Sequence, residues 1–101
     1  MAARTIYGLI GGGGEILSGS ADFTVQRVDV GLYTVFFNRS FSAQPAVIVS
    51  QVYPSEVDSA GGNTLDNAVI VGITPERFRV KTGDPSGAAS DRSFAFVAMG
   101  G

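Results

Sequence analysis

Short runs of β-branched and aromatic residues recur along the whole chain, and each run is bounded by Gly, Pro, Asn, Asp or Ser. Such runs are typical of β-strands, and the residues that flank them are typical of turns. No segment keeps apolar residues at helical spacing for three turns, and fourteen glycines interrupt most windows of that length. The pattern therefore predicts an all-β fold with eight strands, at residues 4–10, 15–18, 22–28, 32–37, 46–53, 68–74, 78–82 and 93–99.

The connections between these strands are too short to contain a crossover helix, so we expect the sheets to be antiparallel. With 101 residues the chain is of a length typical of one domain. Eight short strands predict an antiparallel sandwich or barrel, and we expect an antiparallel β-sandwich of six to eight short strands. Residues 1–20 are assigned to an N-terminal strand and Gly-rich segment, and residues 21–101 to the sandwich. The four glycines at 11–14 are interpreted as a hairpin tip or a linker, because no phosphate-loop Lys and Ser or Thr follow them.

Apolar residues occupy both faces of three expected strands, at 46–53, 68–74 and 93–99. In a small two-layer sandwich, each sheet buries only one of its two faces. A second apolar face left in water would be a liability, and such faces often mark interfaces. We therefore expect part of this surface to be buried against another subunit. The residues assigned to the oligomer interface are Ala95, Val97 and Met99, which alternate with Phe94, Phe96 and Ala98.

The charge of the chain speaks against nucleic-acid binding. Seven Lys and Arg stand against nine Asp and Glu, a net charge of −2, so the usual basic footprint is missing. Arg77, Arg79 and Lys81 alternate with Phe78 and Val80, and these cations are interpreted as the solvated face of one strand. No apolar segment approaches the roughly 20 residues of a membrane helix, and we expect no membrane insertion. The first ten residues have one arginine and too short an apolar stretch for a secretory signal.

The residue types also argue against enzymatic activity. Cysteine and histidine are absent, which removes thiolate nucleophiles and the usual general base. Glycosidase chemistry needs two carboxylates inside a cleft, and a small sandwich offers no deep cleft. Asp91 and Arg92 are instead expected to form an ion pair with each other, at the surface or between subunits. We therefore expect a protein that is not an enzyme.

A polar segment, DSAGGNTLDNAV at residues 58–69, separates two apolar strands. Its first interpretation is a long turn, in which Gly61 and Gly62 supply positive φ and Asn and Asp side chains bond the loop backbone. Its length also allows a ligand-binding role. Calcium is a weaker alternative, because the spacing differs from that of an EF-hand loop, and no other cofactor is expected. The candidate ligand-binding residues are Tyr53, Asp58, Asn63, Asp66 and Asn67.

Four landmarks follow one another over residues 31–101: GLYTVFFNRSF, QPAVIVSQ, NAVIVGITPERFRVKTGD and SDRSFAFVAMGG. This pattern resembles the small trimeric β-sandwich domains of phage tail fibres and bacterial surface proteins, and it is similar to the H-type lectins. The resemblance implies a lectin-like or jelly-roll-like, trimer-forming sandwich. It implies a homotrimer that belongs to a phage particle or bacterial surface and recognises a cell-surface glycan. The chain departs from those lectins in having no Trp, so Tyr7, Tyr33 and Tyr53 are the residues left to stack on a sugar. A purely structural trimerisation or self-assembly domain without a small ligand is the alternative.

Overall fold

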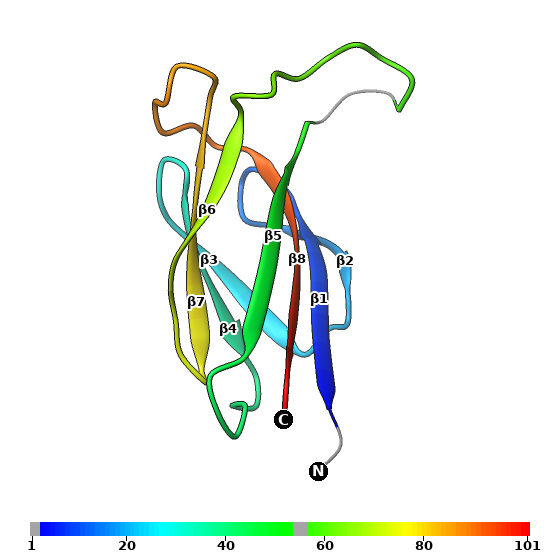
Figure 1. Ribbon diagram of the computed structural model, residues 1–101, viewed down its shortest axis with the longest axis vertical. Coiled ribbons are helices and arrows are strands. Elements are labelled where there is room, and N and C mark those ends of the chain that lie inside the picture. Colours follow the sequence, from blue (N-terminus) through cyan, green and yellow to red (C-terminus); the bar gives the residue numbers. More distant parts are fainter. Residues whose placement is uncertain (1–2, 54–56) are drawn as a thin grey trace.

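The computed structural model describes residues 3–53 and 57–101, which form eight strands and no helix (Figure 1). The described part of the chain accordingly has no helix that could cross a membrane. All eight predicted strands are present, and their ends agree with the prediction to within one residue. The strands are β1 (Arg4–Ile10), β2 (Ile16–Gly19), β3 (Phe23–Asp29), β4 (Leu32–Phe37), β5 (Ala46–Val52), β6 (Asn67–Ile73), β7 (Arg77–Gly83) and β8 (Ser93–Gly100).

The strands form two four-stranded antiparallel sheets that pack face to face, which confirms the predicted sandwich. Sheet A has the order β2-β1-β8-β5, and sheet B has the order β3-β4-β7-β6. The N-terminal segment is part of this sandwich, because β1 lies inside sheet A. It pairs with β8 along its whole length, from Arg4 opposite Gly100 to Ile10 opposite Phe94.

Aromatic side chains from both sheets fill the space between them. The ring of Phe96 meets those of Phe23 and Phe78 edge to face, with centroids 5.0 and 5.2 Å apart. Gly8 makes room for this cluster, because a Cβ at that position would stand 2.5 Å from Cζ of Phe23. Edge-to-face pairs stabilise a core beyond their buried area. The buried apolar residues are Ile6, Ile10, Phe23, Tyr33, Val35, Phe37, Phe41, Phe78, Val80, Phe94, Phe96 and Ala98.

Two of the turns show how the Gly and Asp residues that flank the strands are used. The tetraglycine segment is the tip of the β1–β2 hairpin, where Gly14 N donates to the carbonyl of Gly11 at 2.9 Å. In the loop after β7, Oδ1 of Asp84 accepts a hydrogen bond from the backbone N–H of Ser86 at 2.9 Å. The hydroxyl of Ser86 also donates to this oxygen and lowers the pKa of Asp84.

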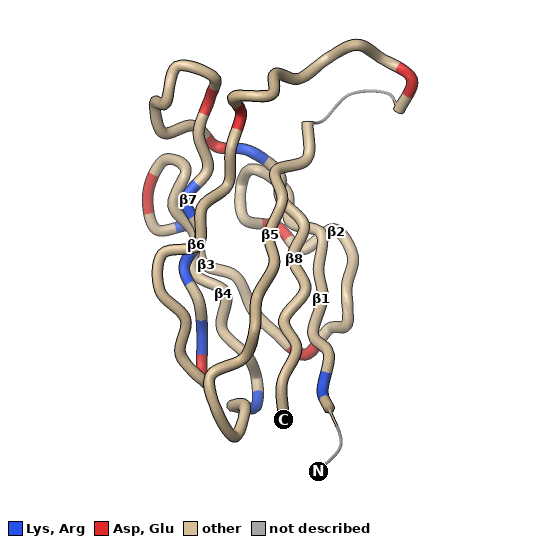
Figure 2. Tube along the Cα trace, viewed as in Figure 1, with Lys and Arg blue, Asp and Glu red and all other residues tan. Residues whose placement is uncertain are grey.

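The two broad faces of the sandwich differ in charge (Figure 2). On β7, Phe78 and Val80 point into the core, and the three cations of the strand point out of sheet B, as predicted. The strands of sheet A carry a single charged residue, Arg4. Its guanidinium donates to the carbonyls of Arg39 and Ser40 at one end of the sandwich. The outer face of sheet A is therefore free of charge.

Candidate functional site

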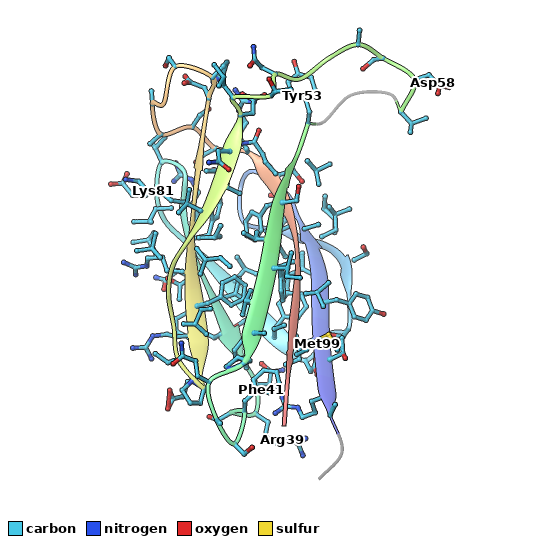
Figure 3. The ribbon with its side chains drawn as sticks, viewed as in Figure 1. Arg39, Phe41, Tyr53, Asp58, Lys81 and Met99 are labelled. Carbon is cyan, nitrogen blue, oxygen red and sulfur yellow. The ribbon has the colours of Figure 1, made fainter. Side chains whose placement is uncertain are left out.

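The candidate ligand-binding residues lie along the loop that joins β5 to β6, at one end of the sandwich (Figure 3). Tyr53 stands at the root of this loop, directly after β5, and Asp58 lies far out on it. Both side chains are exposed. Residues 54–56, between them, lie outside the described part of the chain. Because they lie at different ends of this part of the loop, Tyr53 and Asp58 do not belong to one cluster.

Tyr53 lies against the two loop glycines. A Cβ added to Gly61 would stand 2.8 Å from Cε1 of Tyr53, and one added to Gly62 would stand 3.4 Å from its Cβ. Gly62 has the predicted positive φ, +86°. The same prediction for Gly61 is wrong, because Gly61 is not among the positive-φ glycines and instead allows the backbone to approach the ring. The loop thus covers part of the tyrosine ring, and the rest is exposed.

Asn63 and Asp66 close a turn through reciprocal hydrogen bonds. The backbone N–H of Asn63 donates to Oδ2 of Asp66 at 3.0 Å, and the N–H of Asp66 donates to the carbonyl of Asn63 at 2.9 Å. Oδ1 of Asn63 accepts from the N–H of Leu65. Oδ1 of Asn67 accepts in the same way from the N–H of Ala68 at 2.9 Å. These side chains tie up the loop backbone, as the turn interpretation predicts.

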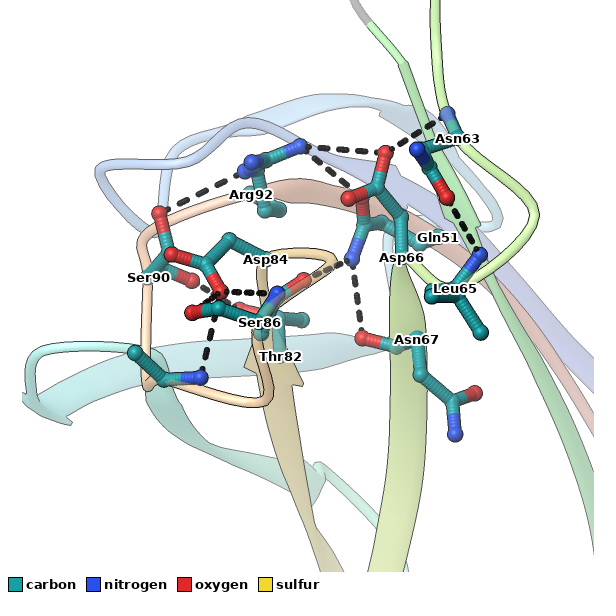
Figure 4. A network of polar contacts seen from close by, with 12 residues as sticks. Gln51, Asn63, Leu65, Asp66, Asn67, Thr82, Asp84, Ser86, Ser90 and Arg92 are labelled. Carbon is teal, nitrogen blue, oxygen red and sulfur yellow. Dashed lines mark hydrogen bonds and ion pairs between the residues drawn. The ribbon is translucent and has the colours of Figure 1, made fainter.

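Gln51, in β5, connects this loop to both sheets (Figure 4). Its side-chain Nε2 donates to the carbonyl of Asn67 at 2.8 Å and to that of Gly83 at 2.9 Å. Its Oε1 accepts from Nη1 of Arg92 at 3.3 Å. The sequence analysis missed Gln51, although a polar residue inside an apolar strand is a signal that the side chain has a partner.

Arg92 and Asp91 do not pair with each other, and the expectation that they would is wrong. Nη1 of Arg92 lies 3.5 Å from Oδ2 of Asp66, whose side chain is only 9% exposed. Asp91 pairs instead with Arg27 on β3, with Nη2 and Oδ2 separated by 2.9 Å. Adjacent side chains of an extended segment point in opposite directions, so each reaches a different partner. Oδ1 of Asp66 is buried and accepts no hydrogen bond from the described residues.

A second polar cluster surrounds Asp91. Its Oδ1 accepts from the backbone N–H of Gly31 at 2.7 Å, and the hydrogen bond from Arg27, followed by this one, lowers the pKa of Asp91. The hydroxyl of Tyr33 donates to the carbonyl of Gly12 at 2.7 Å. Burial, followed by the charge of Asp91, raises the pKa of Tyr33. Tyr33 is therefore a core residue, and its ring is not available to stack on a sugar.

No group of three or more acidic side chains that could hold a metal ion gathers within residues 3–53 and 57–101. Of the oxygen donors considered for calcium, those of Asn63 and Asn67 accept hydrogen bonds from loop N–H groups. Asp66 is paired with Arg92. The loop thus uses these oxygens for its own backbone and for an ion pair.

The loop end contains a groove of about 290 Å³ between β6, the end of β7 and the loop after it. Asn67 is the candidate residue that lines this groove. Its amide Nδ2 makes no hydrogen bond to the described residues, and neither does the ammonium group of Lys81 across the groove. We name this the loop-end groove, lined by Leu65, Asn67, Val69, Lys81, Gly87 and Ala89, among others.

The predicted interface residues lie on the outer face of sheet A, with β8 between β1 and β5. Val97 stands between Tyr7 and Ile48, and their three side chains form one row across the sheet. The rows on either side are Thr5–Met99–Ala46 and Leu9–Ala95–Ser50. No family model, curated protein or solved structure matches this chain.

Proposed function

We propose that this chain is a non-enzymatic β-sandwich binding domain, which forms a homotrimer through the outer face of sheet A and recognises a cell-surface glycan at its loop end. The observation that carries the proposal is the charge-free outer face of sheet A. All ten described residues in the three rows and at Val52 are apolar or carry a neutral hydroxyl. Burying a face of this kind against another apolar surface is favourable, because it removes apolar area from water.

The exposed apolar area of this face is large for a small domain. Ile48 is 75% exposed, Tyr7 52%, Met99 51% and Val97 39%. Together these side chains leave on the order of 500 Å² of apolar surface in water, within the range of the largest patches on monomers. Burial of this patch against an apolar patch of similar size on another subunit would remove about 1,000 Å² from water, the lower limit for a specific protein interface.

Sheet B shows what a solvated face looks like in the same molecule. Its strand β7 carries Arg77, Arg79 and Lys81, and Thr24 and Gln26 are exposed on the edge strand β3. Val69 and Val71 on the other edge strand, β6, are also about half exposed, but they lie beside these cations. An antiparallel sheet with one face in water normally has this polar composition. The outer face of sheet A lacks it, although both faces belong to one small sandwich. This contrast supports a covered face on sheet A, and the resemblance to trimeric fibre domains supports three copies.

Light scattering after size exclusion tests the assembly. At tens of micromolar, the chain of 10.4 kDa is expected to elute with a threefold mass. Val97→Glu places a charge in the middle of the central row and is expected to yield monomer. Val30→Glu is the matched control, because Val30 is similarly exposed but lies in the turn between β3 and β4. A wild-type monomer would refute self-association, and a stable dimer would refute the trimer.

The loop-end groove supports glycan recognition. Sugar sites combine a few directed polar groups with apolar walls. In this groove the free amide of Asn67 and the ammonium of Lys81 can bond hydroxyl groups, while Leu65 and Val69 supply apolar contact. Tyr53, half-exposed at the root of the same loop, adds an aromatic surface at this end.

Glycan-array binding of the assembled protein tests this second part. Asn67→Ala removes the amide that lines the groove, and we expect it to abolish binding. Asn38→Ala is the control, since Asn38 is an exposed asparagine outside the groove. Equal binding by both variants would refute recognition at this groove.

The structural alternative has its own supporting observation. Oδ1 of Asn63 and Oδ2 of Asp66, two oxygens that the sequence offers for a ligand, are occupied by the turn backbone and by Arg92. A purely structural trimer would show the threefold mass and bind no glycan on the array. The two experiments together therefore distinguish the binding domain from the self-assembly domain.

A further inference from the structure

A β-bulge distorts β6 beside the cationic strand β7. Ile70 stands opposite Val80 and Ile73 stands opposite Phe78, so two residues, Val71 and Gly72, face the single residue Arg79. Such a bulge bends its strand away from the regular ladder. The sheet therefore opens at its outer face next to Arg79.

Gly72 keeps this opening empty. Its φ is +83°, which favours glycine, and a Cβ at this position would meet nothing within 4 Å. Beside it lies a groove of about 410 Å³, a volume in the range of small-ligand sites. We name this the bulge groove, lined by Thr34, Val71, Gly72, Thr74, Arg77 and Arg79, among others.

The two arginines of the bulge groove lack acidic partners. Arg77 and Arg79 are two residues apart on the same face of β7, about 7 Å along the strand. The hydroxyl of Thr34 accepts a hydrogen bond from Nε of Arg79 at 3.1 Å, which orients this guanidinium. Its terminal nitrogens, and the whole guanidinium of Arg77, make no hydrogen bond or ion pair with the described residues. Glu76, next to Arg77 in the chain, does not pair with it.

The other cations of the chain show that pairing is common elsewhere. Arg27 is bound to Asp91 and Arg92 to Asp66, while Arg4 donates to two carbonyls. The chain has more acidic than basic residues, with a net charge of −2. Even so, no described carboxylate lies within ion-pair distance of Arg77 or Arg79. Two unpaired guanidinium groups beside one hollow form a geometry that suits a planar or tetrahedral oxyanion.

We infer that the bulge groove binds the sulfate or carboxylate group of an acidic sugar. The anion lies between the guanidinium groups of Arg77 and Arg79, which donate to its oxygens. The sugar ring occupies the hollow above Gly72, where the hydroxyl of Thr34 and the side chain of Val71 border it.

The shape of the groove favours a compact ligand over a peptide. An acidic peptide at this groove would bind most readily by adding a strand to the edge of sheet B beside it, which is β6. The bulge at Val71 and Gly72 interrupts the regular ladder that such pairing needs. An extended nucleic acid would need a longer basic surface than these two arginines provide.

This site rests on the proposed binding role but not on the assembly or on the loop-end groove. It lies on sheet B, so covering the outer face of sheet A leaves it open to solvent. A trimer would present three copies of it, and a monomeric variant would retain one.

The test is NMR titration of the full chain with a sulfated disaccharide and with the same disaccharide without sulfate. We expect the sulfated sugar to shift the amide signals of Thr34, Val71, Gly72 and Arg79, and the neutral sugar to leave them unchanged. Arg77→Gln is expected to weaken binding about tenfold, since a hydrogen bond to a charged group is lost. Arg39→Gln is the matched control, because Arg39 is also exposed and its side chain has no partner in the described residues.

Several results would overturn the inference. The first is that millimolar sulfated disaccharide shifts no amide signal, and the second is that Arg77→Gln and Arg39→Gln weaken its binding equally. The others are that free sulfate binds as tightly as the sulfated disaccharide, or that a tetraglutamate peptide binds in place of the sugar. Repeating the titration with Val97→Glu and with Asn67→Ala separates this site from the proposed function. Retained binding in both variants would support an independent site, even if the trimer or the loop-end groove were refuted. Its loss in Asn67→Ala would show that the sugar binds at the loop end and would overturn the inference.

Discussion

Replacing Gln51 with alanine is expected to loosen the loop end of the sandwich. The substitution removes two hydrogen bonds, to the carbonyls of Asn67 and Gly83, and one acceptor for Arg92. With each bond worth about 1 kcal/mol and the part-buried carbonyl of Gly83 left without this donor, the free energy of unfolding should fall by about 2–3 kcal/mol. For a domain of this length, that is a decrease in Tm of roughly 10–20 °C.

Thermal unfolding followed by circular dichroism measures this loss. All variants must be compared at one protein concentration, because self-association makes Tm depend on concentration. Gln44→Ala is the control, since Gln44 is exposed in the loop before β5 and its side chain bonds no described residue. Gln51→Glu loses both donors and gives Arg92 a charged, stronger acceptor, so it tests whether the contact with Arg92 alone can hold this end together. If Gln51→Ala costs no more than Gln44→Ala, the network does not hold this end together. If Gln51→Glu unfolds like the wild type, the bond from Arg92 rather than the two donors matters.

Two further perturbations test the turns and the acid response. Gly31→Ala is expected to destabilise the chain by about 1–3 kcal/mol more than Gly87→Ala. Both glycines have positive φ, but a Cβ at Gly31 would stand 2.5 Å from the carbonyl of Thr82, whereas one at Gly87 meets nothing. Equal losses in chemical denaturation would contradict this steric account. Because the folded state lowers the pKa of Asp91, its pairing with Arg27 stabilises the chain above the ordinary carboxyl pKa and is lost as the pH falls through the folded value. Asp91→Asn should therefore show a smaller fall in Tm between pH 7 and about pH 3 than the wild type, and parallel profiles would refute the pairing.

The strands were predictable because their residues alternate. Phe78 and Val80 are buried while Arg79 between them is exposed, and this period of two is visible in the sequence. The order of the strands in each sheet was not predictable in the same way. Alternation shows which side chains share a face of a strand, but it does not show which strand lies beside it. The bulge at Gly72 was missed, although an isolated glycine inside an apolar strand is a known signal for one.

The loop site was predictable only in part. Asn63 and Asp66 lie in the turn that their residue types indicate, because Asx side chains bond nearby backbone groups. The partners of Asp91 and Asp66 were not predictable, because Arg27 and Arg92 are distant in the sequence and no local pattern links them. Long-range ion pairs depend on how the strands are ordered in the sheets, which the local sequence does not determine.

The position of β8 at the centre of sheet A has a consequence for how the chain folds during synthesis. β8 is made after the seven other described strands, yet β1 and β5 both depend on it for pairing. Until β8 leaves the ribosome, β5 has no partner strand in sheet A, and β1 is paired only with the short strand β2 of its hairpin. Sheet B can pair earlier, because β3, β4, β6 and β7 precede β8 in the chain. Completion of the sandwich must therefore wait for its last strand, and a nascent chain stopped before β8 would expose strands prone to aggregation.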